Sequence, residues 1–173
     1  MTEDSQGDQA LPIRAVFTGP REWVIEGFRL AHARFTEEAA KDVAGTEAPA
    51  KAAFIPLFEA LNWAATLIEN LRDEDGVEIT PTMQGIRFAR NQVHHAWANA
   101  LEMKFVDVQS VAGPVTISGK SFDGWYWRPI TNLPDPPERQ PDRLGQQAYR
   151  QRLEGRPAAE ALEELEELLA RLV

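Results

Sequence analysis

The residues whose chemistry is most evident lie between positions 87 and 97, in the stretch RFARNQVHHAW. This stretch holds two arginines, one asparagine and two of the three histidines in the chain. Arginine stays charged, and its planar guanidinium matches phosphate oxygens. Histidine titrates near neutral pH and can therefore give or accept a proton. Such a set suits phosphodiester cleavage, above all in RNA, where the ribose 2′-hydroxyl is a built-in nucleophile. The candidate site residues are Arg87, Arg90, Asn91, His94 and His95.

A helix would bring these residues together. At about 100° per residue, the five polar positions share one arc of roughly 140°. Small and apolar residues occupy the opposite arc and allow a second helix to approach closely. Thr80-Pro81 has the pattern of a helix start, so we expect one helix from Pro81 to about Lys104 to carry the arc. The simpler interpretation of a basic polar arc is a solvated helix face.

Apolar residues at helical spacing predict the other helices. Pro56 falls inside the second of them, which either begins there or kinks. Val115, Ile117, Trp125 and Trp127 alternate around residues 119–124, a pattern typical of a short β-hairpin with its turn at 119–124. We therefore expect a mainly all-α chain with a β-hairpin insertion and a C-terminal helical hairpin. The expected helices, besides the one at 81–104, cover residues 20–42, 46–72, 143–153 and 157–173.

Composition limits the function classes. A chain of 173 residues with 43% hydrophobic residues forms one domain with a real core. The net charge of −9 argues against a broad nucleic-acid footprint. The absence of cysteine excludes disulfides and thiolate metal sites. No apolar run is long enough for a membrane span, and the acidic start lacks the pattern of a secretory signal. We expect a cytoplasmic protein without membrane contact, metal or other cofactor.

The stretch from Arg90-Asn91 to His95 resembles the R-x4-6-H motif of the HEPN superfamily. The resemblance covers roughly residues 18–110. It implies a HEPN-like helical bundle and a metal-independent endoribonuclease, generally composed across a homodimer, in toxin–antitoxin or antiviral defence systems. It implies that Arg90 binds the scissile phosphate, with Arg87 in support, and that His95 is the general acid or base. Asn91 is the polar residue after the arginine. His94 is one residue short of the usual spacing but closer to Arg90 on an ideal helix, so the choice between the two histidines stays open.

The sequence pattern and the resemblance together give the expected domain plan. We expect a mobile tail at 1–17, which lacks periodicity, the HEPN-like domain at 18–110, the hairpin and a proline-rich connector at 111–142, and the C-terminal helices at 143–173. The resemblance also implies a set of partners. The expected partners are a second copy of the chain, RNA, and a protein antitoxin or other neighbour-encoded protein. The tail beyond residue 113 resembles that of actinobacterial proteins that carry such a domain, and this names no activity.

Several alternatives stay open at this stage. Many HEPN members keep the fold and lose activity, so the alternative function is a non-catalytic helical module that binds a protein or a nucleotide. Trp125 and Trp127 are expected to pack on the helices, the alternative being that they stack on an RNA base. Glu69 is expected to be solvated, the alternative being a carboxylate that orients an arginine or imidazole of the site.

Overall fold

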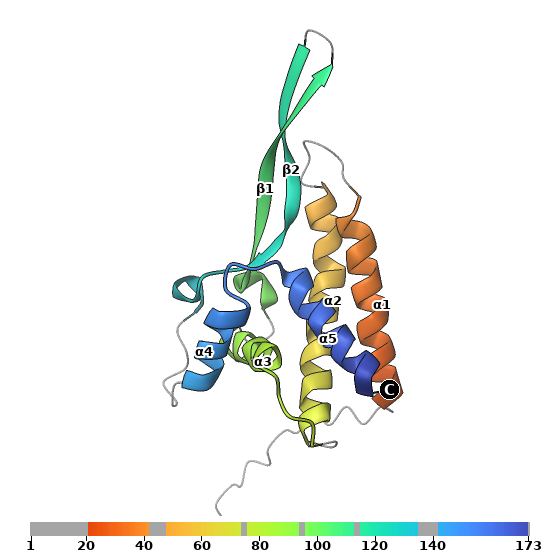
Figure 1. The fold of residues 1–173 in the computed structure, drawn as a ribbon, viewed down its shortest axis with the longest axis vertical. Coiled ribbons are helices and arrows are strands. Elements are labelled where there is room, and N and C mark those ends of the chain that lie inside the picture. Colours follow the sequence, from red (N-terminus) through yellow and green to blue (C-terminus); the bar gives the residue numbers. More distant parts are fainter. Residues whose placement is uncertain are drawn as a thin grey trace, which may run out of the picture.

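The computed structural model describes residues 21–41, 48–73, 76–93, 96–112, 115–134 and 142–172. The expected tail at 1–17 and both residues of the His94–His95 pair lie outside these ranges. The described chain is mainly helical with one two-stranded antiparallel sheet (Figure 1). Its elements in chain order are α1 (Arg21–Ala39), α2 (Ala48–Asp73), α3 (Pro81–Val93), β1 (Leu101–Ala112), β2 (Val115–Trp127), α4 (Arg143–Arg152) and α5 (Ala158–Leu172).

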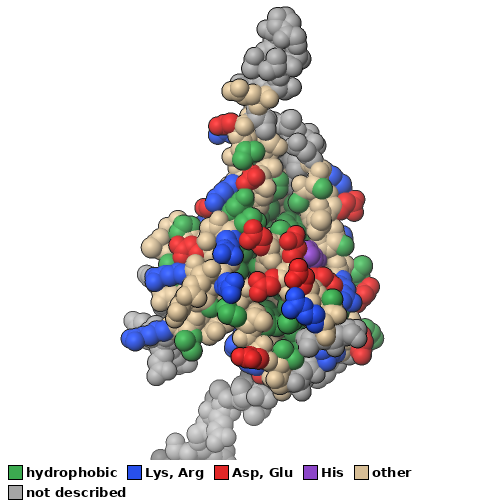
Figure 2. Space-filling view, viewed as in Figure 1, with side chains coloured by type: hydrophobic (Ala, Val, Ile, Leu, Met, Phe, Trp, Pro, Cys, Tyr) green, Lys and Arg blue, Asp and Glu red, His purple; other side chains and the backbone are tan. Residues whose placement is uncertain are grey.

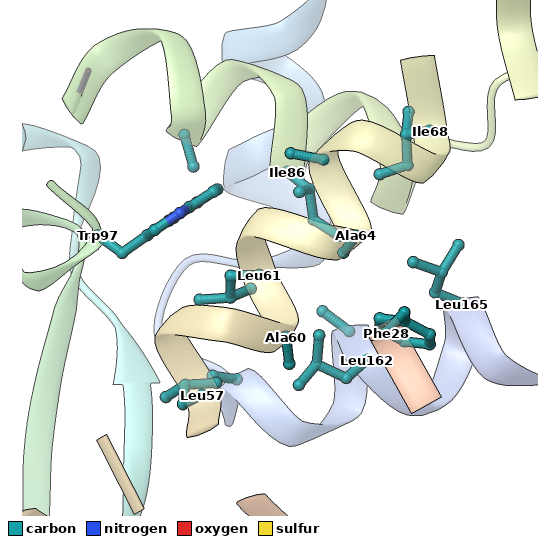
Figure 3. Packing of buried hydrophobic residues seen from close by; sticks show 14 of the residues in the cluster. Phe28, Leu57, Ala60, Leu61, Ala64, Ile68, Ile86, Trp97, Leu162 and Leu165 are labelled. Carbon is teal, nitrogen blue, oxygen red and sulfur yellow. The ribbon is translucent and has the colours of Figure 1, made fainter. Parts of the chain in front are cut away.

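The core lies between α1, α2, α3 and α5. The long helices α1 and α2 pack side by side, and α5 packs against both (Figure 1). Phe28 of α1, Leu61 of α2 and Leu162 of α5 are fully buried in this core (Figure 3). Apolar side chains three and four residues apart line the facing sides of these helices, which is why their periodicity could be read from the sequence. Helices α1, α2, α4 and α5 confirm the predicted ones, and α2 continues through Pro56.

The prediction of one helix from Pro81 to Lys104 is wrong beyond Val93, where α3 ends. A short 3-10 helix, Trp97–Asn99, follows, and β1 begins at Leu101. Leu101 pairs with Trp127 in the sheet, and both side chains are buried. This pairing between distant segments overrides the local helical spacing, because it buries a leucine and a tryptophan that a longer helix could not bury in the same place.

The hairpin is longer than expected, and its turn is elsewhere. Residues 119–124, expected as the turn, lie within β2, and the strands are joined through residues 113 and 114, which lie outside the described ranges. The register shifts by one residue between Lys104 and Phe105, so that Asp123 is a bulge in β2. Much of the hairpin projects beyond the helices (Figure 1).

Both hairpin tryptophans pack on the helical body, as expected. Trp125 lies with its ring centroid 5.0 Å from that of Phe54 on α2, and its Nε1 donates a hydrogen bond of 3.1 Å to the Ala50 carbonyl. Trp127 is fully buried, with edge-to-face contacts to Trp97 and Tyr149. The base of the hairpin is thereby fixed to the bundle. None of the described helices is both long enough and apolar enough to cross a bilayer.

Helix α4 packs closely on α3, and Phe88, Tyr149 and Leu153 extend the core into this contact. Gly85 makes the approach possible, because a Cβ at this position would lie 3.1 Å from Leu153 and 3.4 Å from the Tyr149 backbone. Phe88 packs on the Tyr149 ring at 5.7 Å. The buried Tyr149 hydroxyl donates a 2.7 Å hydrogen bond to the Arg128 carbonyl. Helix α4 is therefore tied both to α3 and to the end of β2.

Candidate functional site

Arg90 lies in the last turn of α3, where its guanidinium donates a hydrogen bond to the carboxylate of Glu69 on α2 and forms an ion pair with it. The two side chains are 30% and 38% exposed. Glu69 is therefore not simply solvated, and the alternative expectation, a carboxylate that orients an arginine, describes its geometry. The pair holds Arg90 at the junction of α2 and α3 while part of the guanidinium stays open to solvent.

Arg87 and Asn91 share the outer side of α3 with Arg90. Arg87 is half-buried and Asn91 is exposed. Within the described ranges neither side chain has a hydrogen bond or an ion pair. Arg87 lies about 200° around the helix from Gly85, the residue that faces α4, so this surface points away from α4. The structure thus brings three of the five candidate residues to one side of α3 and leaves two of them with unoccupied polar groups.

His94 and His95 follow Val93 directly in the sequence and lie outside the described residues. The structure therefore describes the expected arc only for the three candidates that α3 contains. The chain is anchored on both sides of the histidine pair, because Val93 before it and Trp97 after it are 3% and 0% exposed. The Ala96 amide donates a 2.7 Å hydrogen bond to the Val93 carbonyl. Val93 and Trp97, the described residues that flank the histidine pair in the sequence, are thus both fixed to the helical body.

Asn62 on α2 provides one of these anchors, a role that sequence reasoning did not assign to it. Its Oδ1 accepts a 3.1 Å hydrogen bond from Nε1 of the buried Trp97, and its Nδ2 donates a 2.7 Å hydrogen bond to the Phe58 carbonyl. An indole N–H that is buried needs an acceptor. The only signal in the sequence was an asparagine beside an apolar stripe, which has no meaning until its partner is known. Asn62 sets where the chain runs after the histidine pair.

His32, the third histidine, is not part of this site. It lies on α1, half-buried, with its ring 5.7 Å from that of Phe28. Burial lowers its pKa from the ordinary value of 6.5, while Glu166 and Glu163 on α5 oppose that shift. His32 is a packing residue at the contact of α1 with α5. Among the residues that the structure describes, no three His, Cys, Asp or Glu side chains come together in a group that could hold a metal ion.

The arrangement can bind an anion at the outer end of α3. Arg90 is oriented by a carboxylate, and Arg87, three residues earlier, offers a second guanidinium with free donors. Comparison of the chain with protein-family models, with curated proteins and with solved structures found no match.

Proposed function

We propose that the chain is a metal-independent endoribonuclease of the HEPN type, with its active site at the end of α3. One observation carries the proposal: Arg90, the arginine of the motif, is held by Glu69 on the open side of α3, and the sequence places His94 and His95 four and five positions later. Phosphoryl chemistry without a covalent protein intermediate depends mainly on positioning and charge stabilisation. The Arg90 guanidinium, oriented by Glu69, and an imidazole brought close to it would supply both.

The reaction would proceed through the ribose 2′-hydroxyl. One imidazole of the His94–His95 pair accepts the proton of the 2′-hydroxyl as its oxygen attacks phosphorus. Arg90, with Arg87 beside it, stabilises the charge on the five-coordinate phosphorane. The bond from phosphorus to the 5′-oxygen breaks, and this oxygen takes up a proton from an imidazolium. The products are a 2′,3′-cyclic phosphate and a 5′-hydroxyl. A second copy of the chain would supply the other imidazole, in a cytoplasmic toxin–antitoxin or antiviral setting.

The test is cleavage of total RNA in the presence of EDTA. Wild type is expected to cleave, and Arg90→Ala and His95→Ala are each expected to lose the activity by at least about a hundredfold. Arg34→Ala is the matched control, because Arg34 also pairs with a glutamate of α2, Glu59, but on the α1 side. The proposal would be wrong if both site variants kept their activity. It would also be wrong if Arg34→Ala lost as much activity as the site variants.

One observation favours the second candidate, a non-catalytic module that binds a protein. The hairpin projects beyond the helices (Figure 1), and it exposes Val106 and Met103 at 45% and 38%. A two-stranded ladder is marginal in water unless something covers it. This candidate predicts a stable complex without RNA turnover. Val106→Lys should abolish that complex on size exclusion while leaving the far-UV circular dichroism unchanged, and a complex that persists in this variant would count against a hairpin interface.

A further inference from the structure

Helix α4 presents an outer face made of arginine and glutamine. Arg143, Gln147 and Arg150 are exposed and follow one another at spacings of four and three residues, so they form one stripe. Together with Gln146 and Gln151 they line an open hollow of about 490 Å³. The two arginines lie about 10 Å apart along the helix axis. This surface therefore offers two guanidiniums at the sides of an amide-rich depression.

The arginines around α4 differ from several others in the described chain. Arg29, Arg34 and Arg90 each form an ion pair with a glutamate, namely Glu166, Glu59 and Glu69. No such ion pair is found, within the described ranges, for the arginines that surround α4: Arg128, Arg143, Arg150, Arg152 and Arg156. In Figure 2 blue side chains lie over α4 and the loop before α5, and red ones gather over α5.

The two described carboxylates at the ends of α4 form no ion pair with its arginines. Asp142 is the N-cap of α4, where its side chain accepts a 2.8 Å hydrogen bond from the Gly145 amide. Glu154 is half-buried at the other end of the helix. The chain has a net charge of −9, whereas the described residues around α4 include five arginines without an ion pair. Such a local excess of positive charge attracts anionic polymers.

We infer that the outer face of α4 binds single-stranded RNA through its phosphate backbone. The arginines match phosphate oxygens, and the glutamine amides can both donate to and accept from base edges. An acidic peptide is the other polyanion that guanidiniums attract, and its binding is an outcome of the test below. The inference rests on the proposed function, since it supplies a binding surface for the same RNA.

This surface is separate from the candidate cleavage site. Gly85 and Phe88 of α3 face α4, whereas Arg87 lies on the far side of α3. The α4 face would therefore add affinity and orient the strand without taking part in bond breaking. Loss of its arginines is expected to weaken binding and raise KM while leaving kcat close to that of wild type.

The test is binding of a fluorescein-labelled 2′-O-methyl RNA, measured by fluorescence anisotropy at several salt concentrations. This RNA lacks the 2′-hydroxyl nucleophile, so binding is measured whether or not the protein cleaves. Arg143→Gln/Arg150→Gln is expected to bind about tenfold more weakly. The slope of log affinity against log salt should fall by about 1.4, because each lost contact to a single strand removes about 0.7.

The matched control is Arg34→Gln/Arg171→Gln, which removes two exposed arginines from α1 and α5 and is expected to bind like wild type. Equal weakening in the two double variants would show a bulk charge effect and overturn the inference. Absence of binding by wild type, or equally tight binding of an oligoglutamate peptide, would overturn it as well. Failure of the cleavage assay would leave these measurements intact, so the two proposals can fail independently.

Discussion

The carboxylate of Glu69 on α2 and the guanidinium of Arg90 on α3 form an ion pair across the junction of the two helices. Both side chains remain partly exposed, so the pair contributes little to stability, well under about 1 kcal/mol. Its effect is on position, because it limits the directions in which the Arg90 guanidinium can point. The first prediction below separates this orienting role from a structural one.

Glu69→Gln is expected to lower kcat for RNA cleavage by about tenfold, because the amide keeps the shape of the carboxylate but no longer fixes the charge of Arg90. KM should not rise, since the phosphate no longer competes with a carboxylate. Initial rates on a short fluorogenic RNA measure both constants. Glu59→Gln, which removes the partner of Arg34, is the control and should leave them unchanged. An unchanged kcat in Glu69→Gln would contradict the orienting role.

Trp97→Phe is expected to reduce the free energy of unfolding by about 2 kcal/mol. Trp97 is fully buried, so the smaller ring leaves a cavity and takes the hydrogen-bond donor away from Asn62. Urea unfolding followed by circular dichroism measures the change. Trp23→Phe is the matched control, because Trp23 is 68% exposed and should cost less than about 0.5 kcal/mol. If both variants lose the same free energy of unfolding, the burial of Trp97 does not explain the loss.

Gly27→Ala is expected to destabilise the protein by about 1–3 kcal/mol. Alanine favours a helix more than glycine does, but a Cβ at position 27 would lie 2.6 Å from Cε2 of Trp63 on α2. Chemical denaturation gives the change. In a Trp63→Leu background the same substitution should cost nothing or stabilise. Gly119→Ala, where a Cβ would meet no atom within 4 Å, should be close to neutral. A Gly27→Ala variant that is as stable as wild type would contradict the close approach of α1 to Trp63.

The stability of the fold should depend on the protonation of His32. Burial lowers its pKa in the folded state below the ordinary 6.5, so below that pH the unfolded chain takes up a proton more readily than the folded one. Above pH 6.5 the neutral His32 therefore does not reduce the free energy of unfolding. As pH falls below 6.5 towards the lowered pKa, the free energy of unfolding decreases, because the unfolded chain binds the proton more tightly. The free energy of unfolding of wild type should decrease more between pH 7.5 and pH 5.5 than that of His32→Gln. Identical decreases in the two proteins would exclude this role.

Apolar periodicity in the sequence was enough to predict the helices that have an unbroken apolar stripe. Phe54, Leu57, Leu61, Ile68 and Leu71 could face only one way on a helix, and α2 follows from them. The same reasoning failed after Val93. Residues such as Ala96, Ala100 and Leu101 have helical spacing, yet Leu101 opens a strand, because its partner Trp127 comes from 26 positions further along the chain. No pattern in the residues around Leu101 predicts its pairing with Trp127.

The sequence by itself determined the residue types at the site, the motif from Arg90 to His95, and most of the helices, because charge, pKa and side-chain periodicity are local properties. Only the tertiary structure decided that Glu69 pairs with Arg90, that Asn62 anchors Trp97, and that the hairpin begins at Leu101. The arginines around α4 became a distinct surface only when the structure showed them without ion pairs in the described ranges, while red side chains gather over α5 (Figure 2). Each of these depends on contacts between distant segments, whose free energy appears only when the core packs.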